Sequence, residues 1–120
     1  MSVDTTTTGC EIRLEPRWNG AVASLAGDLT VRCAADVRRR LDAVVDIVPD
    51  ELTIDLSDVA RLDTAGLAAV TAPAMRARRA AIAVTILPPT APPAQQLVDR
   101  VGVLSMFDRT SFYRTIGVRS

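Results

Sequence analysis

The sequence predicts a single α/β domain: a mixed sheet of four or five strands with an N-terminal hairpin and about four helices packed against it. Three observations lead to this prediction. The chain has 120 residues, the length of one ordinary domain. It opens with two segments of period-two alternation, and its later strand-like segments are separated by stretches of helical period. Strands separated by helices pair in parallel through right-handed crossovers, whereas the opening pair is expected to be antiparallel.

The opening segments predict the hairpin. Residues 1–9 are polar and rich in threonine, and we expect them to form a flexible N-terminal tail. Apolar and polar side chains then alternate over 10–15 and again over 21–26, as they do in half-buried strands. The dipeptide Asn19-Gly20 between these runs readily adopts the positive φ angles of a tight turn.

The middle of the chain predicts a helix, a short strand and a second helix. Apolar residues recur at spacings of three and four through 33–48, and Thr30 is a suitable N-cap for this helix. Residues 52–56 read as a short strand between turn-rich flanks. The second helix is expected to span 63–79, with Pro73 kinking or breaking it.

The last third of the chain predicts one more strand and two more helical segments. Residues 81–87 are apolar on both faces, which is typical of a central parallel strand. Thr90 is suited to cap a third helix that has prolines in its first turn and an apolar stripe reaching Val101. Residues 103–116 are expected to add a short strand or turn and a final helical piece that closes the core.

Composition narrows the range of functions. Lysine plus arginine and aspartate plus glutamate both number 14, so the formal net charge is +0, which argues against a nucleic-acid-binding protein. The chain has no histidine, which excludes Ser-His-Asp and Cys-His catalysis and histidine-ligated metals. Cys10 and Cys33 are too few for a structural zinc site, and we interpret them as small apolar core residues in preference to a redox pair. With no signal-peptide pattern and no apolar stretch near the roughly 20 residues of a membrane span, we expect a cytoplasmic protein without membrane contact.

Residues 54–67 are the most informative segment for function. An apolar strand is followed by an expected loop, and Asp63 and Thr64 then open a helix. Functional sites gather at the carboxyl ends of strands, and a helix N-terminus carries partial positive charge that suits a phosphoryl group. The dipeptide also fits an ordinary N-cap worth about 1 kcal/mol. Gly66 costs about 1 kcal/mol relative to alanine, which indicates close approach of another backbone or of a partner surface.

The pattern D-L-S-x-V-x-x-(I/L)-D-(S/T)-x-G-L, present here from Asp55 to Leu67, resembles the STAS domain of bacterial anti-sigma factor antagonists. A Gly-Asp-Leu turn at 27–29 and a proline-rich helix start followed by Val-Gly-Val-Leu and Phe107 add to the resemblance. It covers residues 10–116, and we accordingly expect one STAS-like domain over 10–118.

This resemblance implies a switch. The hydroxyl residue after the motif aspartate is the family's phosphoacceptor, usually serine and here Thr64. The unphosphorylated protein would bind an anti-sigma factor that is also a serine/threonine kinase and so free a sigma factor. The kinase, holding its own ATP and Mg²⁺, would phosphorylate Thr64 and release the complex, and a phosphatase would reset it. The chain itself would be no enzyme and need no metal or cofactor. The residues implied in partner binding are Asp28, Asp63, Thr64, Ala65, Gly66 and Leu67.

Two alternatives remain open at this point. The first is a STAS interaction module without a phosphoryl switch, acting in a sensor or scaffold, in which Thr64 is only a helix cap. The second is an enzyme in which Asp55, Asp58 and Asp63 gather at the strand end and hold Mg²⁺.

Overall fold

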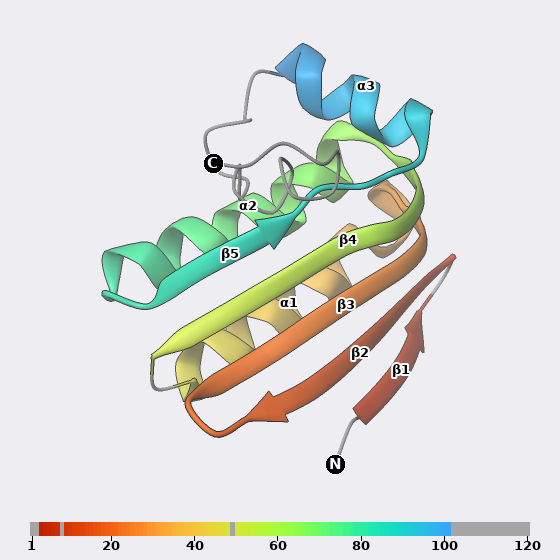
Figure 1. Cartoon of the computed structure of the whole chain (residues 1–120). Coiled ribbons are helices and arrows are strands. Elements are labelled where there is room, and N and C mark those ends of the chain that lie inside the picture. Colours follow the sequence, from red (N-terminus) through yellow and green to blue (C-terminus); the bar gives the residue numbers. More distant parts are fainter. Residues whose placement is uncertain (1–2, 8, 49, 102–120) are drawn as a thin grey trace.

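The computed structural model describes residues 3–7, 9–48 and 50–101 of the chain. The elements, in order, are β1 (Val3–Thr7), β2 (Cys10–Arg17), β3 (Gly20–Leu29), α1 (Val31–Ile47), β4 (Glu51–Leu62), α2 (Thr64–Arg79), β5 (Ala83–Leu87) and α3 (Pro92–Val101). The strands form one five-stranded sheet in the order β1-β2-β3-β4-β5 (Figure 1). The first two pairings are antiparallel and the last two are parallel, so the predicted mixed sheet with an N-terminal hairpin is confirmed. The expected final helical piece lies outside the described residues.

One layer of helices covers one face of the sheet. In Figure 1, α1 and α2 lie side by side behind the strands, and α3 lies beyond the end of β4. The predicted apolar stripe of α1 is buried, and alternate residues of β2, β3 and β4 meet it in the core. Burying one such aliphatic side chain contributes about 1.5–3 kcal/mol, and this core holds the helix starts against the strand ends. The largest fully buried side chains are Ile12, Leu25, Leu29, Leu41, Leu52, Ile54, Leu56, Ile86, Val37, Val59, Val70 and Val98.

The N-terminal segment differs from the expected tail. Residues Val3–Thr7 form β1, which pairs antiparallel with β2 from Val3 opposite Leu14 to Thr7 opposite Cys10. Valine and threonine are β-branched and favour extended backbone, and the outer edge of β2 offers unpaired N–H and C=O groups. The polarity of the segment does not prevent this pairing, because the free edge of β2 supplies the hydrogen-bonding partners.

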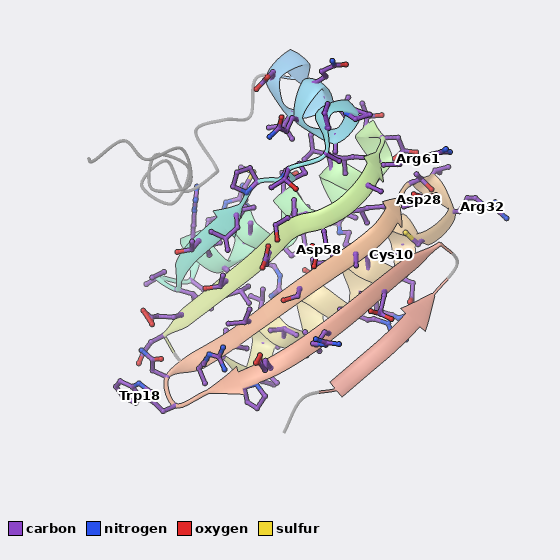
Figure 2. The ribbon with its side chains drawn as sticks, turned by 45° about the vertical axis from the view of Figure 1, so that its right-hand side comes forward. Cys10, Trp18, Asp28, Arg32, Asp58 and Arg61 are labelled. Carbon is purple, nitrogen blue, oxygen red and sulfur yellow. The ribbon has the colours of Figure 1, made fainter. Side chains whose placement is uncertain are left out.

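The hairpin turn lies one residue earlier than expected. Arg17 pairs with Gly20, so Trp18 and Asn19 are the two loop residues. Among the described residues only Gly9, Gly27 and Ala81 have positive φ, so the expected positive φ angles at Asn19-Gly20 are absent. Gly20 is needed for space instead, because a Cβ there would lie 2.0 Å from the Glu51 carbonyl oxygen. Trp18 is 94% exposed at the tip of the hairpin (Figure 2).

The strands β3 and β4 are longer than the sequence indicated. The segment after residue 56, expected to be a loop, continues as strand to Leu62 because β3 also continues to Leu29 and the two pair in parallel. Shifts in register on either side of Gly27, whose φ is 91°, keep the pairing intact through irregular backbone. As a result, both strands end within two residues of a helix.

Three smaller expectations need correction. Pro73 neither ends nor divides α2, which runs unbroken through Thr64–Arg79 with the proline ring buried. The last strand starts at Ala83 and lies at the end of the described strand order, not at its centre. Thr90 does not cap α3: this helix starts at Pro92, and the Thr90 hydroxyl donates to the Ser57 carbonyl oxygen at 2.9 Å. Within the described residues, no helix combines the length and apolar character that a membrane crossing requires.

Candidate functional site

The site lies where β3 and β4 end and α1 and α2 begin. Asp28 stands opposite Arg61 in the β3–β4 pairing, and Leu29 stands opposite Leu62. Figure 2 shows Asp28, Arg32 and Arg61 at this end of the sheet, with Trp18 at the far end. Two helix N-termini therefore open side by side, and both carry partial positive charge toward the same edge.

Asp63 joins these two helix starts. Its carboxylate oxygen Oδ1 accepts the Gly66 N–H at 2.7 Å, which makes Asp63 the N-cap of α2. The other oxygen, Oδ2, accepts the N–H of Val31, the first residue of α1, at 2.8 Å. The Asp63 N–H also donates to the Leu29 carbonyl oxygen at 3.3 Å. One residue thus satisfies donors of both helices and ties β4 to the end of β3.

Thr64 is the first residue of α2, and its side chain is exposed. Because Asp63 is the N-cap, the interpretation of Thr64 as only a helix cap is wrong. The expected cap of α1, Thr30, does stand at the N-cap position, but its side chain makes no capping hydrogen bond. Asp63 from the neighbouring segment accepts the Val31 N–H at the start of α1, and Asp63, not Thr64, caps α2.

The structure divides the six predicted partner-binding residues into two groups. Thr64 is exposed, and Asp28, Asp63 and Ala65 are partly exposed, so all four reach the surface at this end. Gly66 and Leu67 are buried, with Leu67 only 3% exposed. The Leu67 side chain is packed in the core and does not reach the surface at this end. The motif is continuous in sequence, whereas in a helix only some of its side chains face the surface.

Gly66 allows a close approach within the chain itself. A Cβ at this position would lie 2.1 Å from the Leu29 carbonyl oxygen and 2.7 Å from its carbon. The backbone of α2 therefore rests directly on the end of β3. The sequence correctly indicated a close contact at Gly66, but the neighbour is β3 and not a partner surface.

The three motif aspartates do not form a metal site. The Asp55 carboxylate accepts the Ser57 N–H at 2.9 Å, and both Asp63 oxygens are used by the helix starts. Over the described residues, no cluster of three or more histidine, cysteine or acidic side chains could hold a metal ion. The magnesium-dependent alternative has no site in this part of the molecule.

The cysteines lie beneath the same edge and are buried with free thiols. The Cys33 thiol donates to the carbonyl oxygens of Asp28 and Thr30, each at 3.5 Å. Burial, followed by the neighbouring Cys33, raises the pKa of the Cys10 thiol to about 12. A thiol that stays protonated near pH 7 is a poor nucleophile, so Cys10 is unsuited to redox chemistry. Both cysteines are buried, as expected of small apolar core residues.

Sequence reasoning missed Val31. This side chain is apolar yet 69% exposed at the first residue of α1, beside Asp63. A signal was available, because Val31 lies outside the apolar stripe that starts at Cys33. An apolar residue off the stripe at a helix start has no core to enter.

Comparison with known proteins identifies the class. A family model described as Mlab, STAS domain, matches residues 14–106. The chain belongs to the STAS domain family.

Solved structures give the same architecture. The fold is similar to an anti-sigma factor antagonist from Mycobacterium paratuberculosis, at 21% identity over 86% of each chain with a TM-score of 0.73. It is also similar to the anti-sigma factor antagonist SpoIIAA in its unphosphorylated form, at 17% identity over 91% of this chain and 99% of that one with a TM-score of 0.67. The phosphorylated form of the Bacillus SpoIIAA matches at 17% identity over 87% and 98% with a TM-score of 0.60. A search of curated proteins finds no match.

Proposed function

We propose that this chain is an anti-sigma factor antagonist in a partner-switching pathway, with Thr64 as its phosphoacceptor. The observation that carries the proposal is the exposed Thr64 at the first residue of α2, next to the aspartate that holds two helix starts together. The likeness to structures described as anti-sigma factor antagonists supports the same role.

In this proposal, the partner is an anti-sigma factor that is also a serine/threonine kinase. The Thr64 hydroxyl oxygen attacks the γ-phosphorus of ATP held by the partner. A new P–O bond forms, the bond from that phosphorus to the β–γ bridging oxygen breaks, and ADP leaves. The hydroxyl proton passes to a base of the partner. The chain presents the acceptor and supplies no catalytic group, metal or cofactor, and a phosphatase reverses the step by hydrolysis.

The position of Thr64 explains how one phosphate can release a partner without unfolding the chain. The added charge is about −1.5 to −2, and the N-terminal turn of a helix tolerates negative charge. In an interface centred on this turn, the same charge would have to lose its water shell against the partner, which weakens binding. The free protein therefore keeps its fold while the complex dissociates.

Paired substitutions test the proposal. Thr64→Ala should capture the kinase from native cytosol whether or not ATP is present, because the complex cannot be released. Thr64→Glu should fail to capture it. Thr90 is the matched control, since it is also an exposed threonine, and Thr90→Glu should bind like the natural chain.

Mass spectrometry of the captured natural chain supplies the second readout. ATP should release the partner as phosphate appears on Thr64. Equal capture by the Thr64→Ala and Thr64→Glu variants would contradict the switch and favour a STAS interaction module without one. The remaining expectations, a cytoplasmic protein with no nucleic-acid or membrane partner, belong to the same proposal.

A further inference from the structure

We propose that Asp63 is a positioning residue that couples the chemical state of Thr64 to the first turn of α1, so that phosphorylation of Thr64 weakens the hydrogen bond between Asp63 and Val31. The inference rests on the proposed function only in taking Thr64 as the phosphoacceptor. It adds α1 to a switch that the motif alone assigns to α2.

The first step of the argument is the dependence of α1 on Asp63. The side chain of Thr30 makes no capping bond, and the first turn of α1 contains no acidic residue. The Val31 N–H is held by the Asp63 carboxylate at 2.8 Å, from 32 positions away in the sequence. The first turn of α1 thus takes its cap from the α2 segment.

The second step is the difference between the two bonds of the carboxylate. The bond to Gly66 is local, within the first turn of α2, and is partly buried. The bond to Val31 joins two distant segments and is exposed. Water replaces an exposed hydrogen bond more readily than a partly buried one, and a bond between distant segments orders more chain. The Val31 bond is therefore the weaker of the two.

The third step is the effect of a phosphate. Thr64 directly follows Asp63, so the phosphate would add negative charge beside a carboxylate that is already negative. This repulsion pushes the carboxylate away from its present position, and the exposed bond to Val31 yields first.

The consequence is a larger switch surface. Val31 presents an apolar side chain that is 69% exposed, next to the exposed Arg32. When Asp63 holds the first turn of α1, the Val31 side chain and Thr64 form one surface. When the hydrogen bond between Asp63 and Val31 is weakened, the first turn of α1 frays. The Val31 side chain then loses its fixed position.

Amide hydrogen exchange on the full chain tests this coupling without any partner. The chain is prepared with phosphothreonine at position 64 by chemical ligation, so the result does not depend on the kinase. Exchange at Val31 should be at least tenfold faster than in the unmodified chain, after normalisation to the core amide of Val37. Gly66 should change less than threefold. Phosphothreonine at Thr90 is the control of equal charge and should leave Val31 unchanged.

Asp63→Asn separates coupling from a merely structural role. Asparagine keeps one side-chain carbonyl acceptor, so it can cap one helix but cannot bridge two. In this variant, Val31 should exchange fast already, and phosphothreonine at position 64 should add no further change. Asp58→Asn, at an exposed position of β4, is the matched control and should keep the natural response.

Two results would overturn the inference. One is an unchanged Val31 rate on phosphorylation of the natural chain, which needs no variant and so does not depend on whether Asp63→Asn folds. The other is a full response that persists in Asp63→Asn. Either could occur while the Thr64→Ala and Thr64→Glu capture results still hold, so the coupling and the proposed function fail independently.

Discussion

Replacing Gly66 by alanine tests the contact between α2 and the end of β3. The added Cβ would lie 2.1 Å from the Leu29 carbonyl oxygen and 3.0 Å from the Leu29 Cγ. An ordinary carbon–oxygen contact needs about 1 Å more than the first distance. The nearest atom belongs to the backbone of a paired strand, so it cannot rotate away as a flexible side chain would.

The expected change in the free energy of unfolding of Gly66→Ala combines opposing effects. Helix propensity favours alanine over glycine by up to about 1 kcal/mol. Overpacking of this kind costs about 1–3 kcal/mol. Moving α2 outward also strains the Gly66–Asp63 and Asp63–Leu29 hydrogen bonds, each worth about 1 kcal/mol. The net loss is about 2 kcal/mol, which for a domain of this length lowers the melting temperature by about 8 °C.

The assay is thermal and urea unfolding followed by circular dichroism. The matched control is an alanine-to-glycine substitution at Ala68, an exposed position of the same helix. Ala68→Gly should lower stability by about 1 kcal/mol through propensity alone. If helix propensity alone acted, Gly66→Ala would raise stability and Ala68→Gly would lower it. Packing against β3 makes both destabilising, and a Gly66→Ala protein as stable as the natural chain would refute the reasoning.

Three further predictions concern other parts of the fold. The pKa of Cys10 is raised from 9.0 to about 12, so the protonated thiol contributes fully to the free energy of unfolding below pH 9, and this contribution is lost as the pH rises toward 12. Urea unfolding at a series of pH values should therefore show a shallower decline of the free energy of unfolding above pH 9 in Cys10→Ala than in the natural chain. Arg76 on α2 donates to Asp42 and Asp46 on α1. Arg76→Met should therefore lower the melting temperature slightly, and the loss should be smaller in 1 M salt. A loss that does not depend on salt would indicate packing by the aliphatic part of the arginine side chain. Gly27→Ala should destabilise by about 1–3 kcal/mol, because φ is +91° there and the added Cβ has a backbone oxygen at 2.6 Å; chemical denaturation measures this, and a loss under about 0.5 kcal/mol would contradict it.

Much of the fold could be predicted because hydrophobic period reports which side of an element is buried. The stripe from Cys33 to Val48 and the alternation over 10–15 both predicted faces that are buried in the structure. The N-terminal strand and the extension of β4 to Leu62 could not be found this way. Their residues become strand because a neighbouring edge offers hydrogen-bonding partners, and local sequence does not report that edge.

The site was predicted in part for a similar reason. The motif located Thr64 and Asp63, whose roles depend on the strand–helix junction in which they stand. It did not locate Val31, because no local pattern connects residues 31 and 63. The burial of Leu67 could not be predicted from the motif, because a continuous motif does not distinguish surface residues from those that pack beneath them.

The pairing of β3 with β4 is what brings the starts of α1 and α2 to one carboxylate. Parallel pairing sends both chains toward the same edge, and the register shifts around Gly27 bring Leu29 level with Leu62. A helix then starts from each strand within two residues, so the N–H groups of both helices lie within reach of the single carboxylate of Asp63. Because β4 continues past residue 56 to Leu62, strand pairing places Asp63 beside Leu29, whose carbonyl oxygen accepts the Asp63 N–H at 3.3 Å. The length of β4 is therefore part of the proposed switch, since it places the proposed phosphoacceptor one residue after the aspartate that reaches the start of α1.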